Sequence, residues 1–215
     1  MKFFLDSAHL PHIREAAQLG ILDGVTTNPS LLSKEEGDPV QIVREISKVV
    51  DGPISAEVVS TEHAGMVEQG VEWRQIAENI VVKIPMSTEG LKAIRTLRDQ
   101  EIPTNCTLVF SPTQALMAAK AGAAMVSPFV GRLDDIQVRG MELIDEIVQV
   151  FSNYEISTEV LVASIRSPVH VADAARIGAD ISTIPWSVMQ ALARHPLTDI
   201  GIERFFADWQ KIQNR

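Results

Sequence analysis

Cysteine is nearly absent from this sequence, and several other signals are missing altogether. Cys106 is the only cysteine among 215 residues, which excludes an internal disulfide framework and a cysteine-based zinc site. The five histidines are scattered without HExxH-like spacing, so we expect no metal ion. Neither GxGxxG nor GxxxxGKS/T occurs, which removes the usual nucleotide-binding fingerprints.

Positive charge is also scarce and dispersed. The chain carries 19 basic and 28 acidic residues, for a net charge of −9. An extended nucleic-acid or anionic-membrane surface needs clustered lysine and arginine, and the basic residues here are scattered. Met1–Leu5 leads to Asp6 before any long apolar stretch can form, so the sequence predicts neither a signal peptide nor a membrane span. We expect a cytoplasmic protein without nucleic-acid or membrane partners.

Short apolar runs, many of them rich in β-branched residues, alternate with segments of helical spacing along the whole chain. Strands are predicted at 2–6, 24–30, 53–59, 79–85, 104–110, 124–127, 158–164 and 180–184. Helices are predicted from Leu10 to a stop at Gly20, from 39 to 50, around Ala64, Val67 and Val71, around Leu91, Ile94 and Leu97, from 114 to a stop at Gly122, and around 144–151.

Eight such units with right-handed crossovers predict an α/β fold, a single (β/α)8 TIM barrel over residues 1–215 with an extra C-terminal helix. A doubly wound open sheet has the same alternation, and periodicity alone does not separate the two. The extra helix is predicted at about 198–213, with apolar residues on one side, namely Ile202, Phe205, Phe206, Trp209 and Ile212. That face must cover either the barrel or a neighbouring subunit.

A lysine stands inside one of the apolar strands, in Asn79-Ile80-Val81-Val82-Lys83-Ile84-Pro85. An unpaired ammonium in such a run loses several kcal/mol of solvation, so folding alone does not favour it there. Burial favours the neutral amine, which can attack a carbonyl carbon and form a Schiff base. Lys83 is therefore a candidate nucleophile, although a lysine at a strand end can also reach solvent with its charged group.

Other polar side chains fall near the carboxyl ends of successive strands, which is the face of a barrel where active sites lie. They are Asp6, Thr26, Asn28, Glu57, Asn105, Thr107, Ser127, Ser164 and Arg166. Asp6 by itself is also typical of a helix cap and Asn28 of a turn. Glu57 lies in a buried strand where a carboxylate needs a partner, and a lysine and a carboxylate on neighbouring strands can divide nucleophilic and acid–base roles. Arg132 and Arg166, with Ser164, could bind a small anionic substrate or simply be surface residues.

Three motifs, in this order, resemble a known family. Gly24–Leu31 reads GVTTNPSL, Val82–Pro85 reads VKIP, and Ser127–Asp135 reads SPFVGRLDD. They are similar to the signatures of the short transaldolases, a group that includes the fructose 6-phosphate aldolases. The resemblance extends to Pro196–Gly201 and covers nearly the whole chain.

The resemblance implies a role for each candidate residue. Lys83 would form the Schiff base, Glu57 would activate a water that relays protons, and Asp6 would assist cleavage and formation of the carbon–carbon bond. Thr107 would orient that water. The resemblance assigns Thr26, Asn28, Asn105 and Ser127 to the pocket that holds the dihydroxyacetone hydroxyls, and Arg132, Ser164 and Arg166 to a phosphate site. Phe129 stands where the family's aldolases tend to carry tyrosine, and Glu57 where they tend to carry glutamine, so this chain has the transferase pair.

The implied reaction is transfer of a dihydroxyacetone unit from fructose 6-phosphate or sedoheptulose 7-phosphate to an aldose phosphate, as in the pentose phosphate pathway. No cofactor is needed, because the iminium is the electron sink. Alternatives are a 6-deoxy-6-sulfofructose donor, an aldolase that releases dihydroxyacetone, and a non-catalytic sugar-phosphate binding barrel. Short members of the family usually form pentamers or decamers in which the terminal helix reaches a neighbour, so we expect a homo-oligomer.

Overall fold

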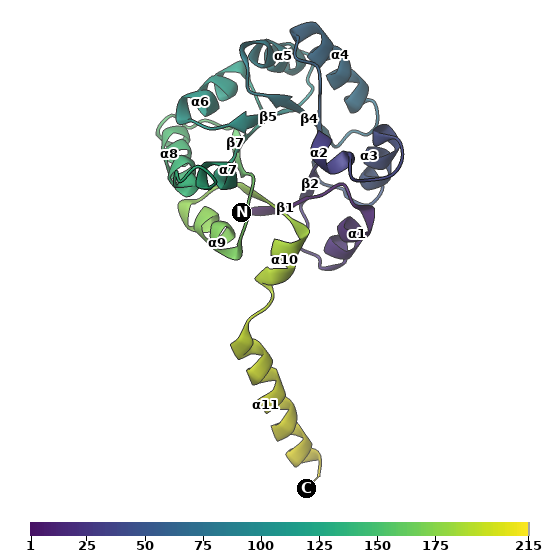
Figure 1. Ribbon diagram of the computed structural model, residues 1–215, viewed down its shortest axis with the longest axis vertical. Coiled ribbons are helices and arrows are strands. Elements are labelled where there is room, and N and C mark those ends of the chain that lie inside the picture. The colour runs from purple at the N-terminus through teal and green to yellow at the C-terminus, as the bar shows by residue number, and fades with distance from the viewer. Residues whose placement is uncertain (215) are drawn as a thin grey trace.

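Eight parallel strands pair in chain order, and the last pairs with the first, in a computed structural model that describes residues 1–214 (Figure 1). The strands are β1 Lys2–Asp6, β2 Gly24–Thr26, β3 Ile54–Glu57, β4 Ile80–Pro85, β5 Thr104–Val109, β6 Met125–Pro128, β7 Glu159–Val162 and β8 Ile181–Ile184. Because the sheet is closed, the open-sheet alternative is wrong and the predicted (β/α)8 barrel is confirmed.

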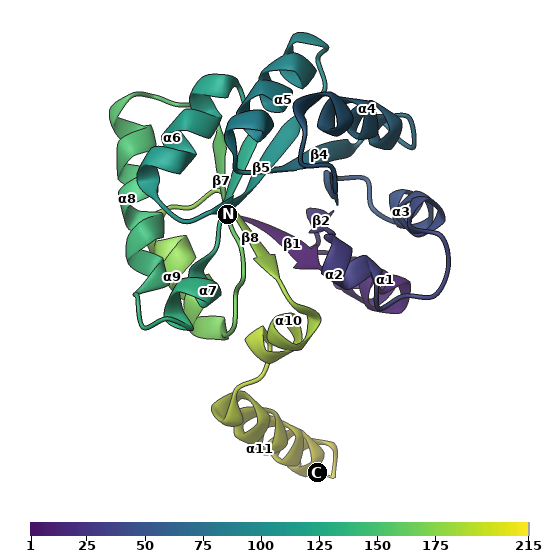
Figure 2. The ribbon, with the colours of Figure 1, turned by 45° about the horizontal axis from the view of Figure 1, so that its top comes forward.

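Helices surround the barrel in both views, except for the last one, which projects from it (Figures 1 and 2). They are α1 Leu10–Gln18, α2 Pro29–Leu32, α3 Pro39–Ser47, α4 His63–Arg74, α5 Thr88–Asp99, α6 Pro112–Ala121, α7 Val130–Asp134, α8 Gly140–Asn153, α9 Pro168–Ile177, α10 Trp186–Leu192 and α11 Pro196–Gln213. The sequence analysis did not predict α9 or the short helices α2, α7 and α10. It also extended several strands too far, since β2 ends at Thr26 and β3 at Glu57.

Local side-chain chemistry explains where several helices begin and end. The side chains of Asp38, Ser87 and Ser111 accept backbone hydrogen bonds from the first turns of α3, α5 and α6. Gly122 has φ of 99° and ends α6 in the left-handed conformation, as its position predicted. The helix predicted to reach residue 50 ends at Ser47.

Helix α4 buries a different set of residues from the one its sequence suggested. Ala64 is exposed and Val67 and Val71 are half-buried, whereas Met66 and Gly70 are buried. A Cβ at Gly70 would lie 3.0 Å from Leu97 and 3.1 Å from Val82. Glycine therefore lets α4 pack closely against both the barrel and α5, a contact that helical spacing alone does not reveal.

The barrel interior contains an apolar layer formed by alternate residues of the strands. Its members are buried and pack together: Phe4, Val81, Met125, Leu161, Ala163 and Ile181. Two further apolar clusters fill the space between the strands and the surrounding helices. Since side chains of a strand alternate between its two faces, the residue two positions after each interior residue also points inward. That next position is polar on several strands.

Helix α11 projects away from the barrel in both views (Figures 1 and 2). It begins at Pro196, two residues before the predicted start, and contains no buried residue. Phe205 is 79% exposed and Trp209 is 56% exposed. The predicted apolar face is therefore present but does not cover the barrel of its own chain. Among residues 1–214, no helix is both long enough and apolar enough to cross a membrane.

Candidate active site

Lys83 lies on the inner side of β4 directly opposite Glu57 of β3. Its ammonium nitrogen is 3.1 Å from Glu57 Oε2 and donates a hydrogen bond of 3.2 Å to the carbonyl oxygen of Thr27. The two side chains are only 6% and 13% exposed. A buried ion pair of this kind gains little for stability over apolar residues of the same size, because both charges have lost their solvation. The pair is therefore a candidate for the predicted chemistry.

Asp6 ends β1 beside this pair and is held by its neighbour on β2. The Thr26 hydroxyl donates to Asp6 Oδ1 at 2.9 Å. Burial raises the pKa of the Asp6 carboxyl above its ordinary value, and the positive charge of Lys83 and the hydrogen bond from Thr26 oppose that rise only in part. Asp6 therefore takes up a proton at a higher pH than an exposed aspartate, which suits a group that must accept and return one.

Asn105 is completely buried and links two hydroxyl groups across the barrel interior. Its amide donates to Ser55 Oγ at 3.1 Å, and its Oδ1 accepts a hydrogen bond of 2.7 Å from Ser127. Ser127 lines the substrate-sized pocket described next, whereas Asn105 does not. Asn105 thus orients Ser127 from behind, and the structure does not place it where the prediction of direct contact with substrate hydroxyls requires.

A pocket of about 350 Å³ opens at the carboxyl ends of the strands. Most of the predicted site residues line it, namely Asp6, Thr26, Asn28, Lys83, Ser127, Phe129, Arg132, Ser164 and Arg166. The volume lies at the small end of the usual range for ligand sites and suits a molecule of sugar-phosphate size. Asn28 also caps α2, since its Oδ1 accepts from the backbone N–H of Leu31 at 2.9 Å.

The two predicted anion-binding arginines line the same pocket, and α7 packs on the segment after β7. The backbone N–H of Gly131 donates to the carbonyl oxygen of Ser164 at 3.0 Å, and a Cβ at Gly131 would lie 2.3 Å from that oxygen. Only glycine allows this approach. Arg132 then lies over the Phe129 ring, 4.8 Å from its centroid, and Arg166 Nη2 bonds to Asp135 Oδ2 at 3.0 Å.

Thr107 lies in an irregular part of β5, where the register with β6 shifts between Cys106 and Val109. Leu108 has φ of 59°, in the left-handed region. The Thr107 hydroxyl is buried and has no hydrogen-bond partner among residues 1–214. Thr107 does not line the pocket. Buried hydroxyls without a partner are uncommon, so this group is suited to bind a water.

The sequence analysis missed several residues that line this pocket: Ser30, Leu31, Lys34, Ala163 and Thr183. Thr183 carried a detectable signal, because it is a hydroxyl residue on the inward side of a buried strand, Ile181–Ile184. Lys34 carried none, since it lies in the exposed segment after α2. Within residues 1–214, no group of three or more His, Cys, Asp or Glu side chains is arranged to hold a metal ion.

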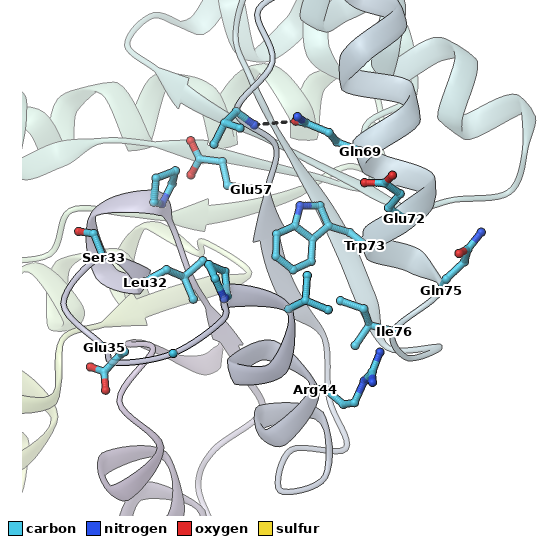
Figure 3. A pocket seen from close by; sticks show the side chains of 15 residues that line it. Leu32, Ser33, Glu35, Arg44, Glu57, Gln69, Glu72, Trp73, Gln75 and Ile76 are labelled. Carbon is cyan, nitrogen blue, oxygen red and sulfur yellow. Dashed lines mark hydrogen bonds between the residues drawn. The ribbon is translucent and has the colours of Figure 1, made fainter.

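A larger cavity of about 760 Å³ lies beside the barrel mouth (Figure 3). Leu32 of α2 forms part of its wall together with Trp73 and Ile76, and Glu57 also lines it. The smaller pocket is the candidate active site, because Lys83 and both predicted anion-binding arginines line it. Glu57 therefore contacts Lys83 while reaching the neighbouring cavity.

The family model and the relatives that match this chain all concern transaldolases. The family model described as Transaldolase/Fructose-6-phosphate aldolase matches residues 3–215. A probable transaldolase of Thermodesulfovibrio yellowstonii is 59% identical over 213 residues, covering 99% of this chain and 100% of that protein. The probable transaldolases of Desulforapulum autotrophicum and Aquifex aeolicus are 57% and 58% identical over 215 residues, covering 100% of this chain and 100% and 99% of those proteins.

Proposed function

The chain belongs to the transaldolase/fructose-6-phosphate aldolase family, and from this premise we propose that Lys83 carries a dihydroxyacetone unit from a ketose phosphate to an aldose phosphate. The enzyme is a transferase of the Schiff-base type that is general to this family. The observation that carries the residue assignment is the buried pair of Lys83 and Glu57, 3.1 Å apart at the mouth of the barrel. A protein that merely binds sugar phosphates has no use for such a pair.

In the first step, the neutral amine of Lys83 attacks C2 of the ketose. The resulting carbinolamine loses its oxygen as water, and protons must reach that oxygen and leave the nitrogen. Glu57 is close enough to Lys83 to serve this transfer through one water, and the free hydroxyl of Thr107 supports the position of that water. The product is an iminium between Lys83 and C2.

In the second step, Asp6 accepts the proton of the C4 hydroxyl. The C3–C4 bond breaks, its electron pair moves into the iminium to form an enamine, and the aldose phosphate departs. An acceptor aldehyde then reacts with the enamine, and Asp6 returns the proton to its carbonyl oxygen. The raised pKa of Asp6 favours this exchange, because a more basic carboxylate accepts the proton of the C4 hydroxyl more readily.

The far end of the substrate is proposed to bind Arg132, Ser164 and Arg166. These side chains line the same pocket as Lys83 and supply two positive charges and a hydroxyl. Phosphate carries a charge near −2, which two arginines match better than the single charge of a sulfonate. To distinguish the two, kcat/KM is measured for fructose 6-phosphate and its 6-sulfo analogue. A clear preference for the sulfo compound would overturn the phosphate assignment.

Transfer is proposed to outpace release of free dihydroxyacetone. Phe129 lines the pocket, and its ring centroid lies 5.7 Å from that of Phe110. Because phenylalanine has no hydroxyl, it supplies no proton donor for the enamine. In the alternative, an aldolase, the enamine is protonated and the three-carbon unit leaves. Glu57→Gln combined with Phe129→Tyr is expected to shift the ratio toward release, and comparable transfer and release rates in the unmodified protein would favour the aldolase.

Borohydride reduction tests the central assignment. Incubation with fructose 6-phosphate and borohydride should add a three-carbon or six-carbon unit to the peptide containing Lys83, since an iminium is reducible and a non-covalent complex is not. Mass spectrometry of the digested protein locates the adduct. If no adduct forms, or if it persists in Lys83→Met, the Schiff-base assignment to Lys83 is wrong.

We further propose that residues 1–215 form one domain and that α11 packs on another copy of the chain in a pentamer or decamer. The exposed apolar side chains of Phe205, Phe206 and Trp209 support this, because an apolar helix face of that kind needs a cover. The proposed setting is the cytoplasm and the pentose phosphate pathway, where the proposed substrates occur. Sedimentation of the protein with and without Trp209→Glu measures the oligomeric state, and a monomer in both would contradict the packing of α11 on a second copy.

A further inference from the structure

Thr183 has no part in the roles assigned so far, although it lines the active-site pocket. It lies on β8 with only 2% of its surface exposed, and its Oγ1 is 2.6 Å from Thr26 Oγ1. Thr26 in turn donates to Asp6 Oδ1 at 2.9 Å. Resting on the proposed role of Asp6 as the base for C3–C4 cleavage, we propose that Thr183 is a positioning residue that supports Asp6 through the Thr26 hydroxyl.

The single proton of each hydroxyl fixes the direction of this chain when Asp6 is ionised. A carboxylate only accepts hydrogen bonds, so Thr26 must give its proton to Asp6. The contact of 2.6 Å between the two hydroxyls then requires Thr183 to donate to Thr26. Donation from Thr183 polarises the Thr26 hydroxyl and strengthens its bond to the carboxylate.

The direction can reverse when Asp6 holds the proton taken from the substrate. A protonated carboxyl can donate to Thr26, and Thr26 can then donate to Thr183. The reversal needs only rotation of the O–H groups, that of the Asp6 carboxyl included, and Asp6 later gives its proton to the carbonyl oxygen of the acceptor aldehyde. Thr26 thus remains hydrogen-bonded to Asp6 in both protonation states, and the chain favours the ionised one, because a hydrogen bond to a charged carboxylate is the stronger of the two.

Other groups also act on Asp6, and a test must leave them unchanged. Lys83 of β4 and Glu57 of β3 face it, and Lys34 acts on it from the segment after α2. His9, His12 and Glu35 line a neighbouring cavity together with Asp6. Replacing Thr183 removes none of these charges, so any change in the titration of Asp6 comes from the hydroxyl chain.

Thr183→Val keeps the shape of the side chain and removes only its hydroxyl. We expect kcat to fall roughly 5- to 15-fold with KM changed less than about twofold, the usual size for one lost hydrogen bond to a polar network. The acid limb of the kcat/KM profile should move to higher pH by roughly half a unit, because ionised Asp6 has lost support. Thr183→Ser should restore both quantities. Ser182→Ala, on the outward side of the same strand, is the matched control.

Thr183→Ala beside Thr183→Ser forms a second pair that differs by one hydroxyl, and it serves if the valine variant does not fold. An unchanged kcat and pH profile in the variants without the hydroxyl would overturn the proposal, as would an equal loss in Thr183→Ser. Borohydride trapping on Lys83 tests the proposed Schiff-base function separately from the role of Thr183, since iminium formation does not require Asp6. An adduct in every variant with no difference in kcat overturns only the role of Thr183, whereas no adduct in the unmodified protein overturns the proposed function as well.

Discussion

Two neighbouring layers of the barrel interior have opposite character, although the same strands build both. The lower layer is apolar and includes Phe4, Val81, Met125 and Ile181. Two residues further along these strands, the upper layer carries the inward-facing polar groups Asp6, Lys83, Ser127 and Thr183. One period of side-chain alternation, about 7 Å of strand, separates the part that stabilises the barrel from the part that performs chemistry.

Pairing between polar groups reduces the free-energy cost of burying the upper layer. Most of its hydroxyl and amide groups pair with one another, in Ser127–Asn105–Ser55 on one side and Thr183–Thr26–Asp6 on the other, whereas the Thr107 hydroxyl has no partner among residues 1–214. Its charges are paired as Lys83 with Glu57. Polar groups that satisfy each other contribute little net stability, whereas the apolar layer below contributes through burial. Substitutions in the two layers should therefore affect different measurements.

The largest expected effect is on activity and comes from the upper layer. Lys83→Met should lower kcat/KM at least roughly ten-thousand-fold, because the covalent intermediate cannot form. The double variant Lys83→Met/Glu57→Gln should lose as much activity and yet unfold in urea at the same or a higher midpoint, since both buried charges are gone. A double variant much less stable than the unmodified protein would show that the pair also stabilises the fold.

The next effect is on stability and comes from the lower layer. Leu161 is completely buried, and Leu161→Ala should reduce the free energy of unfolding by about 2–5 kcal/mol through lost burial and a cavity. The kcat of the folded protein should change little. Leu19→Ala, at a position 53% exposed, is the control and should stay within about 0.5 kcal/mol. If Leu161→Ala lowers kcat as strongly as stability, the two layers are not separable.

Asp6 makes the contribution of the upper layer to stability depend on pH. Its pKa is raised in the folded protein, chiefly by burial, so ionisation at this site opposes folding. That penalty is absent below the unfolded pKa of about 3.9 and grows as pH rises through the folded value. Asp6→Asn should therefore be more stable than the unmodified protein near neutral pH, with the gain fading at acid pH.

Asp99→Asn provides a control of opposite sign for this measurement. A hydrogen bond from Arg98 lowers the pKa of exposed Asp99, so its ionised form favours folding and the amide should slightly destabilise the protein at neutral pH. Urea unfolding of both variants between pH 3 and 8 distinguishes the cases. A stability gain in Asp6→Asn that is independent of pH would contradict the account.

The smallest expected effect lies at the rim of the pocket, beyond both layers. Arg166→Ala should raise KM roughly tenfold while kcat stays closer to its original value, because the anionic end of the substrate does not change during bond cleavage. Arg166 is also paired with Asp135, so Arg139→Ala, another exposed arginine paired with a carboxylate, is the control. An unchanged KM in Arg166→Ala would overturn the proposed anion site.

Patterns that lie within a few neighbouring residues were readable from the sequence. The eight strands, most of the long helices and the end of α6 at Gly122 follow from local spacing and backbone preference. Lys83 and Glu57 were identifiable because a charge inside an apolar strand is costly wherever the strand lies. The three motifs identified the family, and the match of the family model to residues 3–215 confirms it.

Only the tertiary structure decided what depends on residues far apart in the chain. Closure of the sheet requires β8 to pair with β1, and identical periodicity fits an open sheet. The contact of Gly131 with Ser164, the position of Asn105 behind Ser127, and the chain from Thr183 through Thr26 to Asp6 join side chains on different strands and loops. Sequence spacing determines which face of a strand a residue occupies, but strand register and packing determine which atom it meets there.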